Sequence, residues 1–367
     1  MTPVELSRTV LHAVRRAVDA GELSVAVPTR AVVAPPGPGG CGDYATSIAL
    51  QLARPAGRTP FQVAEVLRSH LVGADGITDV VLTGPGFLNI SLDRAASGVG
   101  LVGEILRRGD RYGYADGADG RTVQLHCPRD LRAVVVAETA ARILRSQGAL
   151  VRVTAEGFEP AWTSVLGVRV DAVGLAPAEL PVNVRPVPVP APASAELLAL
   201  GRDAGRWALL HPAAHDRPRT GDEHLVQRES NPLFRVRYAH ARARAATRNA
   251  ADLGFTADPG PVAGTGSDTS TLTGTAPLAD VEQALLAALA DHPRVLAAAA
   301  DHRAPDRLAR HLVTLADAAL PFLLTVLPRG GEKPSAAHRA RLALAEAVGA
   351  VLAGGLALLG IDAPEHL

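Results

Sequence analysis

The sequence contains little cysteine and almost no lysine. Its two cysteines, Cys41 and Cys127, lie far apart, and neither belongs to a Cys-x-x-Cys pair or a Cys/His cluster. This pattern argues against a disulfide framework and a structural zinc site, so we expect no metal and a reduced, cytoplasmic environment. Lys333 is the only lysine, so nearly all of the positive charge comes from arginine.

Aromatic residues make up only 3% of the chain, and the formal net charge is zero. With 47% hydrophobic residues, the 367-residue chain can still form cores in two or three domains, built from alanine, valine and leucine. A neutral chain is unlike a generally basic nucleic-acid binder, so RNA contacts must come from local arginine patches, and no DNA partner is expected. Short apolar runs and charged first residues predict neither a membrane span nor a signal peptide.

The most informative stretch is NPLFRVRYAHARARAATR, residues 231–248, whose spacing predicts a helix with three faces. One face carries small residues suited to close packing: Val236, Ala239, Ala243, Ala246 and Ala250. The opposite face carries a basic group: Arg237, His240, Arg244 and Arg248. A third edge places Tyr238 between Arg235 and Arg242. Guanidinium groups bind phosphates and a tyrosine can stack on an unpaired base, so the helix suits RNA, although the spacing also fits the solvated face of an ordinary bundle helix.

Three segments of the C-terminal half resemble arginyl-tRNA synthetases. The stretch NPLFRVRYAHARARA is similar to the opening of the family's anticodon-binding domain, typically NPVYYVQYAHARI. Residues 197–210 resemble the helix that leads into that domain, and residues 341–367 resemble its last helices and PERM-like end. The chain departs from the family at Arg235, where a second tyrosine is common, and at Leu367, which replaces a methionine.

The resemblance implies that residues 196–367 form a helical anticodon-binding bundle with tRNA as its partner. A further helix of this bundle is expected to carry three more arginines near the first arginine-rich helix. The implied anticodon or tRNA contacts are Arg235, Arg237, Tyr238, His240, Arg242, Arg244, Arg248, Arg303, Arg307, Arg310 and Arg341.

Two motifs nearer the N-terminus resemble the extra N-terminal domain of the same family. They are GDYAT, which begins at Gly42, and GPGFLN, which begins at Gly84. The family uses this domain to touch the tRNA elbow, so the resemblance implies a domain over residues 1–117 in which Phe87 and Asn89 contact the D-loop. An aromatic ring and an amide on one face of a strand could stack on a base and read its edge. From the residues alone, Phe87 also fits a core position and Asn89 a turn.

A β-α-β unit is predicted over residues 121–155, followed by a proline-rich linker. The segment ARILRSQGALVRV resembles the first helix and second strand of the class I synthetase nucleotide-binding fold, so residues 118–195 are expected to form a truncated Rossmann-like remnant. Where the family carries an HxGH tetrad, this chain has HCPRDLRAVV, so the resemblance implies a degenerate nucleotide site at His126, Arg129 and Asp130. Where the family carries a KMSK-like loop, this chain has RPVPVPAPASAE, which predicts a stiff extended linker.

Local signals predict several further elements. Helices are expected over residues 4–20 and 59–70, and strands over 23–27 and 78–83. Asp43 is placed to cap a helix that follows it. Two helices of the bundle are expected to be separated by a break at His292-Pro293, and residues 258–274 are expected to form an exposed loop.

These observations predict a multidomain α+β/α fold. It comprises a small α/β N-terminal domain, a truncated Rossmann-like α/β remnant and a C-terminal α-helical anticodon-binding bundle. The resemblance implies a tRNA-binding protein, most consistent with arginine tRNA, that lacks aminoacylation and needs no cofactor. One alternative is a divergent ligase that uses ATP to join arginine to tRNA. The other is a regulatory protein-interaction module that reuses the fold without RNA.

Overall fold

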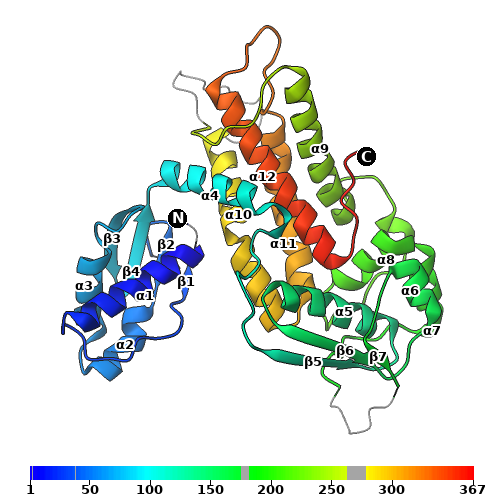
Figure 1. The fold of residues 1–367 in the computed structure, drawn as a ribbon, viewed down its shortest axis with the longest axis horizontal. Helices are drawn as coiled ribbons and strands as arrows, with labels where there is room; N and C mark the ends of the chain where they lie inside the picture. The colour runs from blue at the N-terminus through cyan, green and yellow to red at the C-terminus, as the bar shows by residue number, and fades with distance from the viewer. Residues whose placement is uncertain (2, 38, 175–181, 263–277) are drawn as a thin grey trace. The chain divides into compact units, whose positions relative to one another are not determined.

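A computed structural model describes the chain except for residues 2, 38, 175–181 and 263–277 (Figure 1). Most of the predicted loop at 258–274 therefore lies outside the described residues. The described chain falls into two units, residues 1–103 and 104–367. The second unit contains both the predicted Rossmann-like remnant and the predicted helical bundle.

In the first unit, helices cover one side of a four-stranded antiparallel sheet. The strand order is β1-β2-β4-β3. The elements are α1 (Pro3–Asp19), β1 (Val33–Ala34), β2 (Tyr44–Thr46), α2 (Ile48–Ala56), α3 (Pro60–Leu71), β3 (Ile77–Thr83) and β4 (Phe87–Leu92), and α4 (Arg94–Arg108) follows. The predicted helices at 4–20 and 59–70 and the strand at 78–83 are confirmed.

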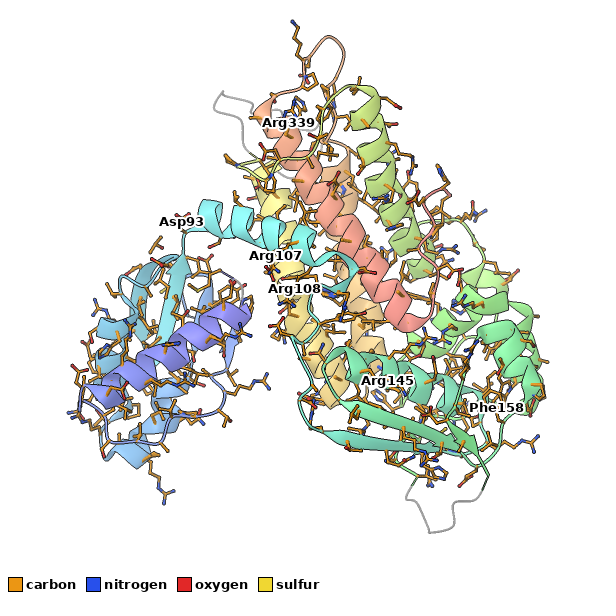
Figure 2. All side chains as sticks on the ribbon, in the orientation of Figure 1. Asp93, Arg107, Arg108, Arg145, Phe158 and Arg339 are labelled. Carbon is orange, nitrogen blue, oxygen red and sulfur yellow. The ribbon has the colours of Figure 1, made fainter. Side chains whose placement is uncertain are left out.

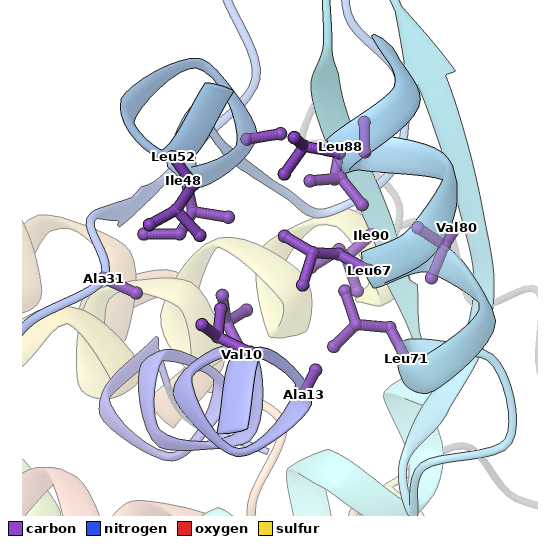
Figure 3. Packing of buried hydrophobic residues seen from close by; sticks show 14 of the residues in the cluster. Val10, Ala13, Ala31, Ile48, Leu52, Leu67, Leu71, Val80, Leu88 and Ile90 are labelled. Atoms are coloured by element: carbon purple, nitrogen blue, oxygen red, sulfur yellow. The ribbon is translucent and has the colours of Figure 1, made fainter. Parts of the chain in front are cut away.

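The core of this unit is aliphatic (Figure 3). Val10 of α1, Leu67 of α3 and Ile90 of β4 are fully buried in it. Two local predictions were wrong. Residues 23–27 form no strand, and the Asp43 carboxylate accepts a hydrogen bond from the Leu92 amide at 2.9 Å instead of capping α2.

The second unit begins, after η1 (Gly109–Arg111), with a parallel β-α-β arrangement. Its elements are β5 (Thr122–Cys127), α5 (Leu131–Ser146), β6 (Leu150–Ala155), α6 (Pro160–Leu166) and β7 (Ala172–Val173). The strand order is β5-β6-β7, and β5 pairs with β6 from Thr122 opposite Leu150 to Cys127 opposite Ala155. The predicted β-α-β unit is therefore confirmed.

The rest of this unit is helical and packs into a bundle (Figure 1). Its elements are α7 (Ala191–Ala199), α8 (Gly201–Leu210), η2 (Asp222–His224), α9 (Pro232–Asp252), α10 (Leu278–Asp301), α11 (Pro305–Leu323) and α12 (Ala336–Leu359). Together with the two α/β portions, this confirms the predicted fold class. The predicted break at His292-Pro293 was wrong, because α10 continues through Pro293 to Asp301.

Helix α12 corrects the expectation that no apolar segment is long enough to cross a membrane. It has 24 residues and a mean hydropathy of 2.1 in its most apolar window, but 78% of that window is buried inside the unit. Its packing is close: a Cβ on Gly354 would lie 2.1 Å from the Asp110 carbonyl oxygen. Length and hydropathy therefore fit the central helix of the bundle.

Two buried histidines face each other between α10 and α11. The rings of His292 and His311 lie 5.2 Å apart, and Tyr112 stacks on His292 at 5.9 Å. Burial, with a smaller effect of His311, lowers the pKa of His292 to about 3, and burial lowers the pKa of His311 to about 4 although Asp291 raises it. Arg294 lowers the pKa of His311 further, by less than Asp291 raises it. Both rings are therefore neutral in the folded chain near pH 7.

We expect this pair to make the second unit sensitive to acid. The folded-state pKa values lie below the ordinary value of 6.5. The two histidines therefore do not lower the free energy of unfolding above that pH, and they lower it progressively as the pH falls towards 3–4. The unfolded chain binds these protons first, at a cost on the order of 2 kcal/mol for each histidine at pH 5. Urea unfolding at pH 7.5 and pH 5 measures this loss. His292→Phe should reduce the difference, whereas the exposed His302→Asn should not; equal pH dependence of His292→Phe and wild type would contradict the assignment.

Candidate nucleic-acid interface

The small-residue face of α9 anchors this helix in the bundle. Val236, Ala239 and Ala243 are buried, and α9 packs against α11 and α12. The side chains are short enough for close approach: a Cβ on Gly349 of α12 would meet that of Ala243 at 3.6 Å. With this face buried, the two basic faces of α9 are left at the surface or under other segments.

Along the third edge of α9, the Phe234 ring, the Tyr238 ring and the Arg242 guanidinium follow one another. The Phe234 and Tyr238 rings stack at 5.5 Å with an interplanar angle of 15°, and the Arg242 guanidinium lies 6.0 Å from the Tyr238 ring centre. Tyr238 is 37% exposed and Arg242 is exposed. Arg235, one turn earlier, pairs with Asp317 of α11 at 3.0 Å. An accessible ring beside guanidinium groups is the arrangement that stacks on unpaired bases and binds phosphate.

The opposite basic face of α9 is covered by the segment 361–367. His240 is 4% exposed, and its Nδ1 contacts the Pro364 carbonyl oxygen at 2.9 Å. Burial lowers the pKa of His240, more than the Pro364 hydrogen bond raises it. Arg244 pairs with the Glu365 carboxylate at 3.0 Å, and Arg248 donates to the Glu365 carbonyl oxygen at 3.2 Å. An RNA contact by His240 does not fit this conformation, because its ring is buried. The Arg244 and Arg248 side chains are still 43% and 39% exposed, so their RNA contacts stay a prediction.

Arg237 lies in a pocket of about 340 Å³ between α8, α9 and the end of the chain. It pairs with Asp203 of α8 at 3.4 Å, and Arg202 pairs with Asp362 at 3.5 Å. Phe234 and Leu367 also line the pocket. Sequence reasoning missed Arg202, Asp203 and Phe234 as members of a site. The match of residues 197–210 to a family helix was the signal that could have pointed to the first two.

The predicted tRNA-contacting arginines that follow α9 in the sequence are not all at the surface. Arg310 pairs with Asp306 and is exposed, and its charge and those of His224 and Arg235 act on His211. Burial, followed by these positive charges, lowers the pKa of His211 to about 4, so this ring at the end of α8 lies near arginines of α9 and α11. Arg303 and Arg307 make no ion pair with any described residue. Arg341 does not fit an RNA contact, because it is 9% exposed and donates to the Thr325 carbonyl oxygen.

In the first unit, Phe87 is accessible and Asn89 is not. Both residues are on the same face of β4, and Phe87 is 39% exposed. The Asn89 side chain is 2% exposed; it donates to Thr83 Oγ1 at 2.7 Å and to the Val81 carbonyl oxygen at 3.3 Å. Its carbonyl oxygen accepts from the Cys41 amide. The predicted reading of a base edge by Asn89 does not fit this position, since its amide holds a loop against the strand.

The three residues of the predicted degenerate nucleotide site do not come together in one site. Asp130 caps α5 by accepting from the Ala133 amide at 2.9 Å, and Arg129 is exposed and pairs with Glu159 at 3.3 Å. His126 lies elsewhere: it is 5% exposed and its Nδ1 contacts Thr154 Oγ1 on the neighbouring strand at 2.8 Å. Burial raises the pKa of Cys127 to about 12, so its thiol stays protonated.

The linker lies across the start of α5, where an open α/β sheet would bind a nucleotide. The second oxygen of Asp130 accepts from the Val189 amide at 3.1 Å, and Arg132 donates to the Val187 carbonyl oxygen at 3.1 Å. Asn183 attaches the linker to β5 as well, because its side chain accepts from the His126 amide and donates to the Gln124 carbonyl oxygen. Phosphates bind at helix N-termini at the carboxyl ends of such strands. Here the Asp130 carboxylate occupies that position beneath the linker, which is unlike a helix N-terminus that is free to bind phosphate.

The second loop at this end of the sheet is also filled by protein. Phe158, labelled in Figure 2, follows β6 and packs edge-on against Trp162 of α6 at 5.4 Å. Trp162 is 3% exposed. The loop thus contributes to the core and not to an open crevice.

Two segments of the chain match protein families. Residues 5–92 match the arginyl tRNA synthetase N terminal domain, and residues 236–367 match the DALR anticodon binding domain. The arginine–tRNA ligase of Renibacterium salmoninarum is 41% identical over 165 residues, which cover 41% of this chain and 30% of that protein. The arginine–tRNA ligase of Frankia alni is 27% identical over 564 aligned positions that cover 100% of both. Because this chain has 367 residues, a large part of the second relative has no counterpart here.

Two solved structures share the fold. Arginyl-tRNA synthetase from Thermus thermophilus aligns with a TM-score of 0.63 and 16% identity, covering 100% of both chains. The enzyme from Plasmodium falciparum aligns with the same TM-score and 9% identity, covering 100% of this chain and 99% of that one.

The fold and the two matched domains define an aminoacyl-tRNA synthetase-like protein with an anticodon-binding helical domain. More particularly, the chain is an arginyl-tRNA synthetase-related protein that has no counterpart to a large part of the relative from Frankia alni.

Proposed function

We propose that this chain binds tRNA in the cytoplasm, with arginine tRNA as its preferred partner, and does not aminoacylate it. The observation that carries the second part is the position of Asp130 and the linker. The Asp130 carboxylate takes the helix N-terminus, where a nucleotide phosphate would need positive potential, and it holds the Val189 amide at 3.1 Å. In this proposal, a site built this way does not support an ATP-dependent step.

RNA binding is supported by accessible groups in both units. The Tyr238 ring and Arg242 are exposed on α9, with Arg235 and Arg310 also near His211. Phe87 is exposed in the first unit. In this proposal the rings stack on unpaired bases while arginines bind phosphates, so binding depends on local patches and not on net charge.

The proposal is tested by two measurements on the full chain. Filter retention of an arginine tRNA transcript should fall steeply as salt is raised, because phosphate contacts release counterions. Arginine-dependent exchange of pyrophosphate into ATP should stay at background. No salt-sensitive retention would remove the support for RNA binding and leave the protein-interaction module, whereas clear exchange would establish the ligase alternative.

Tyr238→Ala is expected to weaken binding of arginine tRNA about tenfold, because an aromatic side chain stacked on a base contributes about 1–3 kcal/mol. Leu253→Ala is the matched control, since Leu253 follows the same helix and is 53% exposed. Arg242→Met should weaken binding and also reduce the salt dependence by about one phosphate contact. Equal affinities of Tyr238→Ala and wild type would show that this edge of α9 does not bind the tRNA.

A further inference from the structure

Two aromatic residues are exposed at the same corner of the first unit. Phe61 is 51% exposed at the start of α3, and Phe87 is 39% exposed at the start of β4. The residues preceding them are in close contact: a Cβ on Gly86 would lie 2.8 Å from the carbonyl carbon of Pro60. The two rings therefore leave the backbone at neighbouring points, although their positions are far apart in the sequence.

The backbone on both sides of this contact is rigid. Gly86 has φ +143°, a conformation that other residues rarely adopt, and Pro60 has a fixed φ at the first turn of α3. Thr59 and Gln62 cap the helix reciprocally. Rings on rigid supports lose less conformational entropy when they bind a ligand.

The core does not require these rings. The buried residues of α3 are Val63, Ala64, Leu67 and Leu71, while Leu88 and Ile90 fill the core side of β4. Exposed rings that contribute little to the core are candidates for an interaction surface.

The charge at this corner is positive. Arg54 and Arg58 are exposed just before α3, and neither makes an ion pair with any residue in the described part of the chain. Glu65, one turn into α3, pairs with Arg68 at 3.7 Å. Exposed rings beside unpaired guanidinium groups fit single-stranded nucleic acid, because bases stack on the rings and phosphates bind the cations.

We propose that Phe61 and Phe87 together stack on unpaired nucleotides of an RNA loop, with Arg58 binding a phosphate of that loop. This inference rests on the proposed tRNA-binding function and adds Phe61 and Arg58 to it. The matching occupant is a single-stranded loop and not a duplex, since paired bases do not expose their faces.

The test compares Kd values of full-chain variants for an arginine tRNA transcript at fixed salt. Phe61→Ala should weaken binding about tenfold, as expected for loss of one stacked base, while Phe61→Trp should retain it. Val72→Ala is the control, because Val72 is 56% exposed at the other end of the same helix. Arg58→Met should lower the salt dependence by about one contact, whereas Phe61→Ala should leave it unchanged.

The two proposals fail in different ways. If Phe87→Ala weakens binding but Phe61→Ala equals wild type, the role of Phe61 is overturned while the tRNA-binding function stands. If Phe61→Ala weakens binding equally to a transcript whose unpaired elbow nucleotides have been deleted, stacking on those nucleotides is overturned. If the wild-type chain does not retain the transcript at all, the proposed function itself fails.

Discussion

Replacing Arg206 with methionine is expected to lower the free energy of unfolding of the second unit by about 3 kcal/mol. Arg206 is fully buried and donates to Glu138 at 2.7 Å, to the Leu359 carbonyl oxygen at 2.7 Å and to the Leu166 carbonyl oxygen at 3.1 Å. These bonds join α8 to α5, α6 and the end of α12. The substitution leaves a Glu138 oxygen buried without its cation. The loss is at the low end of the usual range because Arg142 still pairs with Glu138.

Urea unfolding measures this loss. Two further variants show whether it comes from the buried ion pair. Arg202→Met, in the same helix, changes an exposed arginine and should cost no more than about 0.5 kcal/mol. Glu138→Met combined with Arg206→Met should recover part of the stability, because no buried charge then remains unpaired. A cost for Arg206→Met as small as that of Arg202→Met would contradict the buried ion pair.

Arg132→Met is expected to have a comparable effect, about 3 kcal/mol or more, since hydrogen bonds to charged groups are worth about 1.5–3 kcal/mol each and are not additive. Arg132 is fully buried and donates only to backbone carbonyl oxygens, which are those of Val187, Leu209, Pro212, Ala213 and Asp216. Burial lowers the pKa of Arg132 despite the nearby carboxylates of Asp130 and Asp216. The side chain thus ties the linker and the segment after α8 to the start of α5.

Urea unfolding and limited proteolysis measure this effect together. The substitution should expose the segment 182–190 to cleavage before the bundle unfolds, because the Val187 bond is lost. Arg129→Met is the matched control, as Arg129 is 65% exposed and precedes the same helix. Unchanged cleavage of the linker in Arg132→Met would mean that Arg132 does not secure it. Pyrophosphate exchange should stay at background even in this variant, because Asp130 remains.

The spacing of residues predicted α9 well, but it did not predict which basic face is accessible. The small residues at helical spacing are buried, as expected for a bundle helix. The end of the chain packs against the arginine face, because Glu365 pairs with Arg244, which lies 121 residues earlier. Such a pairing leaves no periodic signal in either segment.

Helix starts and ends that the sequence predicts from capping residues and prolines were correct only where tertiary packing agreed with them. Asp130 caps α5 and Thr59 caps α3, where the sequence predicts the start of a helix. Pro293 did not end its helix, since the following residues continue a buried face that includes Leu296 and Ala299. Asp43 stands before a helix, yet its carboxylate binds the Leu92 amide on β4.

The sequence by itself determined the fold class, the β-α-β unit, the long helices and the two segments that match synthetase domains, because these depend on periodicity and motifs within short stretches. Only the tertiary structure decided which polar groups remain accessible. Asn89, His240 and Arg341 have RNA-binding chemistry, but their side chains are bound or buried within the chain. Whether a polar group faces solvent depends on carbonyls and carboxylates brought from distant segments, and burial strongly favours such internal partners over unsatisfied groups.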